Sequence, residues 1–423
     1  MPSNAWNVDH VRAEFPALAV ADGNRARLFF DAPGGTQVPR HVIERIGEYL
    51  TRTNANSGGP FVTSRDSDAL SEEAHRAMAD LLNAPAPEEI VFGQNMTTLT
   101  FAISRSLGRR FRAGDEIIVT RMDHDGNVAP WLLLARDLGL TVRWLDFDPA
   151  TFEYRLDTLP SLVNERTRLA AVNYASNALG TINDVAAIAR MVHAVGGLVY
   201  VDAVQYVPHA PTDVQAIDCD FLVCSAYKFF GPHQGILWGR RALLDELDAY
   251  KVRPASDELP TKFETGTPAF ESQAGTLGAV EYLDWLGRSM GAAHAATFAS
   301  MSGRRRNVHA AMAAMVAYEA GLAAHLLDGL AEIRGLTVQG ITARDRLHKR
   351  VPTFSITIAG RRPADVAATL AAENIFVWDG DFYATEVVER LGLGNEGGLL
   401  RIGLCHYNTH AEVDRLCAAL RAA

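Results

Sequence analysis

Residues 198–202 read LVYVD and residues 221–228 read FLVCSAYK, two apolar runs that each end in polar residues. Continuous apolar strands separated by helical patterns are typical of a parallel sheet that is covered on both faces. Further runs of this kind are Glu89–Phe92, Glu116–Thr120, Val142–Asp146 and Leu169–Tyr174, and Val185–Val195 is an amphipathic stretch between two strands. The sequence therefore predicts an α/β fold whose mainly parallel sheet lies between residues 88 and 240 and binds ligands at the carboxyl ends of its strands.

A smaller α+β unit is predicted to follow this sheet. The Ala-rich stretch Asn307–Leu330 predicts one long helix. The later patterns predict a strand at Thr353–Ile358, a helix at Ala364–Glu373, strands at Phe376–Trp378 and Leu399–Leu404, and a last helix that a capping box at Thr409–Glu412 opens. Because no repeat or low-complexity linker separates the two units, we expect them to pack tightly.

The overall composition is that of an ordinary globular chain. Of 423 residues, 48% are hydrophobic and 21% are charged, and 40 basic against 50 acidic residues leave a net charge of −10. Nucleic-acid binding normally needs a concentrated basic face. The densest basic run, Arg304–Arg306, is short and typical of a solvated turn. We therefore expect no nucleic-acid partner.

No targeting or membrane segment is expected either. The opening MPSNAWNVDHVRAEF has neither a basic start nor an apolar core, and no run approaches about 18 uninterrupted apolar residues. The cysteines form no CxxC pair, and no metal site is predicted; they are Cys219, Cys224, Cys405 and Cys417. The expected compartment is the cytoplasm.

Lys228 stands out because the chain has only four lysines. It follows a buried-looking strand and lies among Tyr227, Phe229 and Phe230. Apolar surroundings lower the pKa of an ammonium, and an amine nucleophile needs a low pKa. The alternative is a lysine whose stem packs on the aromatic rings while its head reaches water.

Three other polar groups are predicted at strand ends of the same sheet. Asp202 ends LVYVD, where a carboxylate could pair with a protonated pyridine nitrogen or simply cap a helix. Thr97 and Thr98 open a helix, where hydroxyls and free N–H groups suit a phosphate, although such a pair is also a common cap. Ser225 and Tyr227 could add phosphate donors. Together these groups are the parts that a pyridoxal-phosphate site requires.

The segments VDAVQ (201–205) and DCDFLVCSAYKFFGP (218–232) resemble the class V aminotransferase group, which has the pyridoxal-phosphate-dependent fold type I. Further segments are similar, in order, to its cysteine desulfurase branch: VRAEFP (11–16), DHDGNVAPW (123–131), SNALG (176–180), FETGTP (263–268) and RIGLCHYNTHAEVDRL (401–416). The resemblance covers nearly the whole chain. It implies a large domain at 28–300, a small domain made of 1–27 and 301–423, and a homodimer with active sites at the subunit interface.

The resemblance also implies roles for individual residues. Lys228 would hold pyridoxal 5'-phosphate as a Schiff base and move the substrate α-proton, and Asp202 would pair with the ring nitrogen. Arg401 would bind the substrate carboxylate; without the resemblance it would be an ordinary strand-edge arginine. The remaining expected cofactor contacts are Asn177 and Gln205 at the phenolic oxygen, and Thr97, Thr98, Ser225 and, from the second subunit, Thr267 at the phosphate.

The sequence departs from the desulfurases on the substrate side. Their nucleophilic cysteine lies on a loop that reads DGDFYATE here, with Tyr383 near the cysteine position. A phenol cannot replace a thiolate in persulfide chemistry. Trp378, a candidate substrate contact, stands where an arginine is usual, and Tyr227 replaces the histidine before the lysine. The ring-stacking histidine aligns with Asp125, and His124 precedes it as a candidate substrate contact.

Asp125 and Tyr383 are the two further catalytic candidates. Asp125 could act as an acid or base at the cofactor or be a turn residue of Asp-Gly, and Tyr383 could donate a proton or merely cover the pocket. We expect an enzyme acting on a small amino acid or amine by transamination, β-elimination (including C–S lyase chemistry) or epimerisation. The alternatives are a desulfurase with an unconventional sulfur route and a cofactor-binding but silent partner protein.

Overall fold

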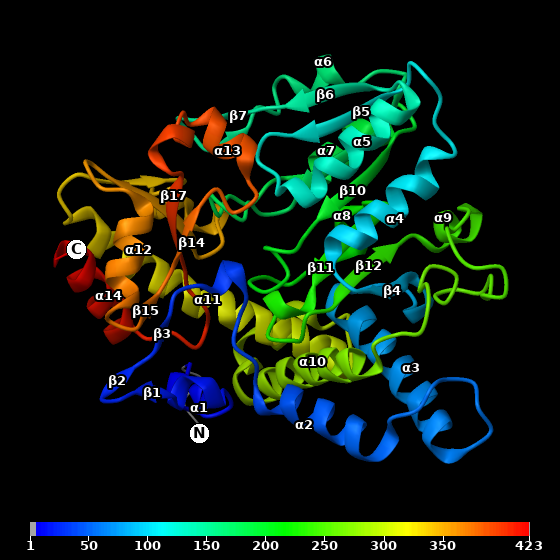
Figure 1. Ribbon diagram of the computed structural model, residues 1–423, viewed down its shortest axis with the longest axis horizontal. Helices are drawn as coiled ribbons and strands as arrows, with labels where there is room; N and C mark the ends of the chain where they lie inside the picture. Colours follow the sequence, from blue (N-terminus) through cyan, green and yellow to red (C-terminus); the bar gives the residue numbers. More distant parts are fainter. Residues whose placement is uncertain (1–5, 423) are drawn as a thin grey trace.

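The computed structural model describes residues 6–422 as two packed units (Figure 1). The larger unit contains a seven-stranded sheet in the order β4-β12-β11-β10-β9-β5-β6. Its strands are β4 (Ile90–Gly93), β5 (Glu116–Thr120), β6 (Thr141–Leu145), β9 (Thr167–Asn173), β10 (Leu198–Asp202), β11 (Phe221–Ser225) and β12 (Gly235–Gly239). The five central and far-edge strands run parallel, whereas β12 is antiparallel to both β11 and β4. The predicted α/β class is confirmed.

The six predicted strands of this sheet all form, and only β12 was not predicted. Its sequence GILWG is short and bounded by glycines, so it carries a weak strand signal. The backbone of Asn95 leaves no room for a Cβ at Gly235, which explains the glycine at the start of the strand. Soon after Lys228, the chain re-enters the sheet as the antiparallel β12, between β11 and the edge strand β4.

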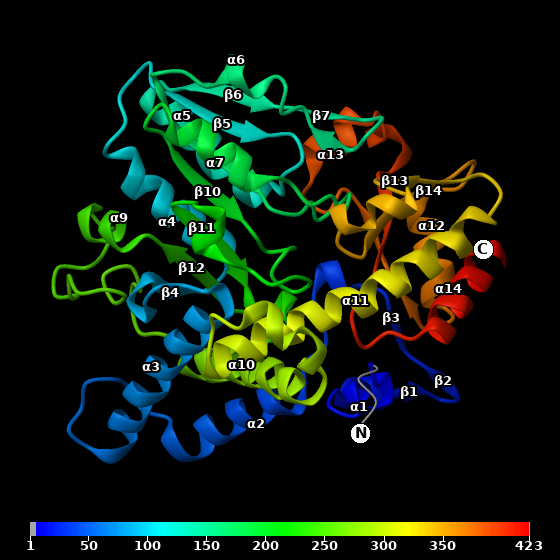
Figure 2. The same ribbon diagram turned by 180° about the vertical axis from the view of Figure 1, so that it is seen from behind.

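Alternating strand residues face two separate helix layers, as a sheet covered on both faces requires. One layer packs α4 and α5 on Ile117, Val119 and Leu169. The other packs α3, α7, α10 and α11 on Ile118 and Ala170. In Figure 2, α10 lies below the sheet, and α11 runs from beside α10 toward the smaller unit at the right. The helices of eight or more residues are α2 (Arg40–Glu48), α3 (Val62–Leu82), α4 (Met96–Gly108), α5 (Ala129–Leu138), α7 (Val185–His193), α10 (Phe270–Met290), α11 (Gly303–Ala331), α12 (Pro363–Ala371) and α14 (His410–Ala422).

The smaller unit has a four-stranded antiparallel sheet in the order β13-β14-β17-β16. Its strands are β13 (Leu336–Gln339), β14 (Thr353–Ile358), β16 (Trp378–Gly380) and β17 (Leu399–Gly403). The single strand predicted at Phe376–Trp378 is two strands: β15 (Ile375–Phe376) pairs with β3 (Leu28–Phe29), and β16 pairs with β17. The predicted capping box opens α14, with Thr409 and Glu412 each accepting the other's backbone N–H.

The packing differs from the expected domain division at both ends of the large domain. Val11 and Phe15, which were expected in the small domain, pack in the core of the large one. Leu28 and Phe30 pack instead in the small-domain core, because β3 pairs with β15. The long helix α11 contributes to both cores, so no single residue near 300 separates them.

Helix α11 is the one helix of residues 6–422 that is long and apolar enough to cross a membrane by length and composition alone. Its most apolar window is 56% buried inside the protein. The buried side chains lie in the two hydrophobic cores, as expected of a core helix.

The contact between α10 and α11 depends on a glycine. A Cβ at Gly287 of α10 would overlap the carbonyl oxygen of Asn307 in α11, whereas nothing lies within 4 Å of a Cβ at Gly321 of α11. We expect Gly287→Ala to lower the free energy of unfolding by about 1–3 kcal/mol. Gly321→Ala should raise it by about 0.5–1 kcal/mol, because alanine is the better helix former. Denaturant unfolding of both variants measures the difference; a shift of the same sign in both would contradict the close approach.

Candidate active site

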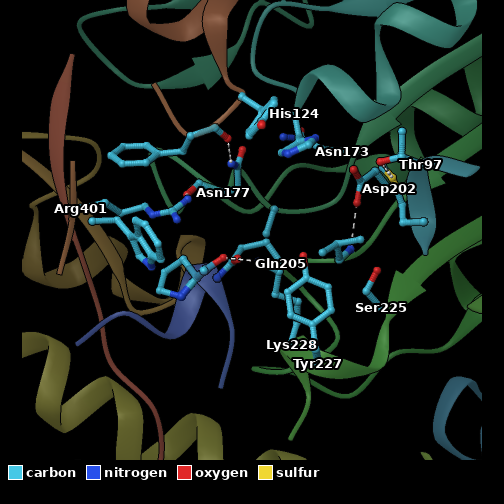
Figure 3. Close-up of a pocket in the computed structure, with 18 of the residues that line it drawn as sticks. Thr97, His124, Asn173, Asn177, Asp202, Gln205, Ser225, Tyr227, Lys228 and Arg401 are labelled. Atoms are coloured by element: carbon cyan, nitrogen blue, oxygen red, sulfur yellow. Dashed lines mark hydrogen bonds between the residues drawn. The ribbon is translucent and has the colours of Figure 1, made fainter. Parts of the chain in front are cut away.

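A cavity of about 450 Å³ opens at the carboxyl ends of β9, β10 and β11, where the sequence places its ligand site (Figure 3). The small domain closes its other side with β17 and the segment 378–383. Eleven of the predicted site residues line it: Thr97, His124, Asn177, Asp202, Gln205, Ser225, Tyr227, Lys228, Trp378, Tyr383 and Arg401. Residues from Pro33 to Arg401, far apart in the chain, therefore meet in one cavity.

Lys228 lies in a short 3-10 turn directly after β11, with only 9% of its surface exposed. Its Nζ donates a hydrogen bond to the carbonyl oxygen of Pro33 and lies 4.6 Å from the ring centre of Tyr227. Burial, reinforced by the charge of Arg401, lowers the pKa of Lys228 to about 7. The amine is thus available in its neutral, nucleophilic form near neutral pH.

Asp202 ends β10 and is also buried. One carboxylate oxygen accepts the backbone N–H of Val204 at 2.9 Å. Burial raises the pKa of Asp202 to about 7, and the charge of Lys228 opposes that rise only in part. A buried carboxyl group with so little compensation is suited to a cationic ligand group such as a protonated ring nitrogen.

A polar network behind Asp202 was not predicted. Asp123 accepts hydrogen bonds from Thr120, from the side chain of Asn127 and from the backbone of Asn173, and burial together with Asp202 raises its pKa to about 8. Asn173 lines the cavity beside Asp202, its neighbour across β9 and β10. The sequence signal was weak: Thr120 and Asn173 are each just the last residue of a strand.

The start of α4 provides the predicted anion site in part. Asn95, Met96 and Thr97 line the cavity at the N-terminus of this 13-residue helix, where free N–H groups favour a phosphate. Thr98 does not line the cavity, and its predicted phosphate contact stays a prediction. Its hydroxyl donates to the carbonyl oxygen of Asn95 and faces out of the cavity, because it completes a capping box. Ser225 lines the cavity from the end of β11.

Two amides present unsatisfied oxygens to the site. The Nδ2 group of Asn177 donates to the carbonyl oxygen of Phe382 at 2.9 Å, and the Nε2 group of Gln205 donates to the hydroxyl of Thr353 at 3.0 Å. The Oδ1 atom of Asn177 and the Oε1 atom of Gln205 are buried without a partner among the described residues. Buried polar atoms are normally satisfied, so these atoms indicate a missing ligand or water.

Arg401 is the third group with an unsatisfied edge. Its Nη1 donates to the carbonyl oxygen of Asn177 at 3.1 Å, and its guanidinium packs 4.1 Å from the ring centre of Phe382. Its Nε is buried without a partner among the described residues. Burial lowers the pKa of Arg401 to about 9. Asp31, which the sequence did not single out, interacts electrostatically with Arg401 and Lys228, although burial raises the pKa of Asp31 to about 6.

The structure shows which of the neighbours His124 and Asp125 faces the cavity. His124, not Asp125, lines the cavity, and its ring stacks on Tyr383 with 5.4 Å between ring centres. Burial lowers the pKa of His124 to about 4, with further lowering by Lys228, so a neutral imidazole faces the cavity. Asp125 lies outside the lining and donates its backbone N–H to the carbonyl oxygen of Tyr383 at 2.6 Å. Its predicted role as an acid or base at the cofactor stays a prediction.

The mouth of the cavity is formed by the segment that follows β15. Trp378 and Tyr383 line it with 51% and 70% of their surfaces exposed, although both are large aromatic residues. Phe382 and Tyr383 both have a left-handed backbone, with φ of 58° and 55°. Non-glycine residues held in this region are uncommon and cluster at functional sites. All four cysteines are buried, and none lines the cavity.

Thr267 lies away from this cavity, in a separate surface groove that Glu264, His75 and Phe270 also line. A contact with the cavity of the same subunit is therefore excluded. Its predicted contact with the cofactor of a second subunit stays a prediction.

The residues present fit pyridoxal phosphate. The cavity offers a buried amine, a buried carboxyl group that forms no salt bridge among the described residues, and the N-terminus of the 13-residue helix α4. The unsatisfied atoms of Asn177 and Gln205 lie between them in the lining. These are groups that the aldehyde, ring nitrogen, phosphate and ring substituents of this cofactor would occupy.

Comparison with known proteins gives the same picture. A model of the family described as Aminotransferase class-V matches residues 28–305 and 306–416. The aminotransferase-like protein FGM3 of Gibberella zeae is 33% identical and covers 99% of each chain. A probable cysteine desulfurase of Synechocystis sp. is 31% identical over 97% of this chain and 94% of its own.

Solved structures agree with these matches. The cysteine desulfurase of Thermococcus onnurineus superposes with a TM-score of 0.85 at 25% identity, covering 98% of this chain and 97% of its own. A C-DES variant with glycine covalently linked to its pyridoxal-phosphate cofactor has the same fold, with a TM-score of 0.76 at 20% identity over 97% and 98% of the two chains.

The low pKa of Lys228 has a consequence for stability in the cofactor-free protein. Because the pKa of about 7 in the folded chain lies below the ordinary 10.5, the unfolded chain binds more protons between these values, and stability rises with pH there. We expect Lys228→Met to stabilise the protein, with a gain about 2 kcal/mol larger at pH 6 than at pH 9. Denaturant unfolding at both pH values measures this gain.

Lys262→Met is the matched control. Lys262 is equally buried, but its Nζ donates to the carbonyl oxygens of Leu244 and Asp245 at 2.9 and 2.8 Å, so its removal should destabilise the protein. A loss of stability in Lys228→Met at pH 6 would contradict the lowered pKa of the buried Lys228 amine.

Proposed function

The chain belongs to the aminotransferase class-V family, and from this we propose that the cavity transforms a small amino acid or amine at its α-carbon. The protein is a pyridoxal-phosphate-dependent enzyme of fold type I, related to the cysteine desulfurases. The observation that carries the proposal is that Lys228, Asp202 and Arg401 line one buried cavity. The proposed reaction classes are transamination, β-elimination, including C–S lyase chemistry, and epimerisation.

The proposed chemistry divides between the cofactor and the chain. Bound pyridoxal phosphate supplies an aldehyde that reacts with amines and a ring that withdraws electrons from the substrate α-carbon. Lys228 Nζ would hold the cofactor and, as a neutral amine, take the proton from the substrate α-carbon. Asp202 would keep the ring nitrogen protonated by pairing with it, and the neutral imidazole of His124 would cover the ring face.

The substrate carboxylate would bind at Arg401. Its Nη1 is already engaged with the carbonyl oxygen of Asn177, so the Nε–Nη2 edge is the part left for two parallel hydrogen bonds. Phe382 covers one guanidinium face and keeps water from it. Trp378 is the direct cross-strand neighbour of Arg401, and together with Tyr383 it flanks the space for the substrate side chain. These aromatic walls favour a side chain larger than that of cysteine.

A substrate panel tests the proposed function. The purified protein loaded with pyridoxal phosphate should show a visible absorbance band that selected amino acids or amines change, and Lys228→Ala should lose the normal band and about 10²–10⁴-fold in turnover. A protein whose band responds to no amino acid or amine would be a silent cofactor-binding partner. A normal band in Lys228→Ala would overturn the role of the lysine.

Arg401→Lys separates amino acid from amine substrates. Lysine keeps the charge but cannot form the two parallel hydrogen bonds, so kcat/KM for amino acids should fall about 10–100-fold. The kcat/KM of amines that lack a carboxylate should stay within about twofold. Equal losses for both substrate kinds would contradict carboxylate binding at Arg401.

Cysteine desulfuration is a second candidate because curated relatives at 30–32% identity carry that name. Against it, every cysteine is buried, and burial raises the pKa of each thiol, so none is an available thiolate. Incubation with cysteine and measurement of alanine together with sulfide or persulfide decides this candidate; absence of both products removes it. The homodimer and the cytoplasmic location also stay predictions.

A further inference from the structure

Residues 176–180 (SNALG) form a loop after β9 that carries Asn177 into the cavity. The loop uses its own N–H groups internally. The hydroxyl of Ser176 accepts the backbone N–H of Leu179 at 3.1 Å, and its carbonyl oxygen accepts the backbone N–H of Gly180 at 3.0 Å. The carbonyl groups of residues 177–180 are left to accept hydrogen bonds from outside the loop.

Four consecutive carbonyl oxygens of this loop accept hydrogen bonds from the small domain. We call these donors the carbonyl clamp: Arg401 Nη1 to Asn177 at 3.1 Å, Ser355 Oγ to Ala178 at 2.7 Å, Arg350 Nη2 to Leu179 at 3.4 Å, and the Val351 backbone N–H to Gly180 at 2.9 Å. A hydrogen bond on every carbonyl in a row leaves the loop little freedom to rotate, so the clamp determines where the Asn177 side chain points.

The clamp also connects the loop to the substrate side. Ser355 in β14 and Arg401 in β17 are direct cross-strand neighbours, so their side chains lie together on one face of the sheet. Thr353, at the start of the same β14, accepts the hydrogen bond from Gln205. Strand β14 thus bonds Gln205 directly, through Thr353, and the loop that carries Asn177, through Ser355.

Arg350 has no carboxylate partner within residues 6–422, although only 6% of its surface is exposed. Its guanidinium donates only to backbone carbonyl oxygens, those of Ile341, Leu179, Thr353 and Val351, and packs 3.9 Å from the ring centre of Phe354. A buried cation without a counter-charge is costly, and burial lowers the pKa of Arg350 to about 9. Stability alone therefore does not explain an arginine at this position.

We propose that Ser355 and Arg350, which do not line the cavity, are positioning residues that hold Asn177 against the phenolic oxygen of the cofactor. This inference rests on the proposed function. Asn177 Nδ2 donates one N–H to the carbonyl oxygen of Phe382, so its second N–H is available to the phenolic oxygen. The loop position, rather than the side chain alone, sets the strength of that hydrogen bond.

The effect is measurable without turnover. A donor at the phenolic oxygen favours the form of the bound cofactor in which that oxygen is negative, so a looser donor raises the pH midpoint of the absorbance change. Ser355→Ala removes one clamp hydrogen bond and should raise the midpoint by about 0.5 pH unit. Arg350→Lys should raise it too, because lysine cannot reproduce the planar fork. Ser355→Thr keeps the hydroxyl and should restore the original midpoint.

Ser104→Ala is the matched control. Ser104 is equally buried, with its hydroxyl donating to the carbonyl oxygen of Phe101 inside α4 at 3.0 Å, and it touches neither loop nor cavity. It should leave the midpoint unchanged. In the cofactor-free protein, Ser355→Ala should speed amide hydrogen exchange in residues 176–182 about threefold to tenfold, and Ser104→Ala should not.

Two results would overturn the positioning role: an unmoved midpoint in Ser355→Ala despite faster exchange in the loop, or equal shifts in Ser355→Ala and Ser104→Ala. The unmodified protein tests the proposed function separately. Absence of a visible band that depends on Lys228 would refute that function, whereas a normal band that Ser355→Ala does not shift refutes only the positioning role.

Discussion

An amine, a carboxyl group and a guanidinium are buried together in one cavity, and each lacks a full set of partners. Burial disfavours the charged form of each group, which is why the pKa of Lys228 and of Arg401 falls while that of Asp202 rises. Water would satisfy these groups but would also weaken their interactions. The cavity is enclosed by the sheet, the loop of residues 176–180 and the small domain. In this arrangement a ligand, not solvent, supplies the missing partners of the three groups.

Much of this site could be predicted because parallel strands bring their carboxyl ends together. Lys228 and Asp202 each follow an apolar run, so pattern alone placed them at one sheet edge. Side-chain direction in the loops could not be predicted. A one-residue difference separates His124, which faces the cavity, from Asp125, which does not, and Thr98 spends its hydroxyl on a helix cap. The partners of Asp123 come from the ends of β5 and β9 and from the turn before α5, and they carry no local signal.

The two sides of the cavity differ in what they determine. The large-domain side carries the groups that fit the cofactor, and the family match accounts for them. On the small-domain side, Phe382 and Tyr383 have a left-handed backbone. Trp378 and Tyr383 are exposed although they are large aromatic residues. Function within a shared fold resides in such local sites. Family membership therefore identifies the cofactor of this protein, whereas substrate selection by the aromatic segment at the mouth is part of the proposed function.

The helix α11 is shared by two hydrophobic cores, its first half with the large domain and its second half with the small one. During synthesis the ribosome must therefore release the chain past Met315 before the large domain can bury the first half of α11. The two domains are then expected to unfold as one cooperative unit rather than in sequence. A nascent chain of this protein would depend on chaperones for longer than one whose domains are separated by a linker.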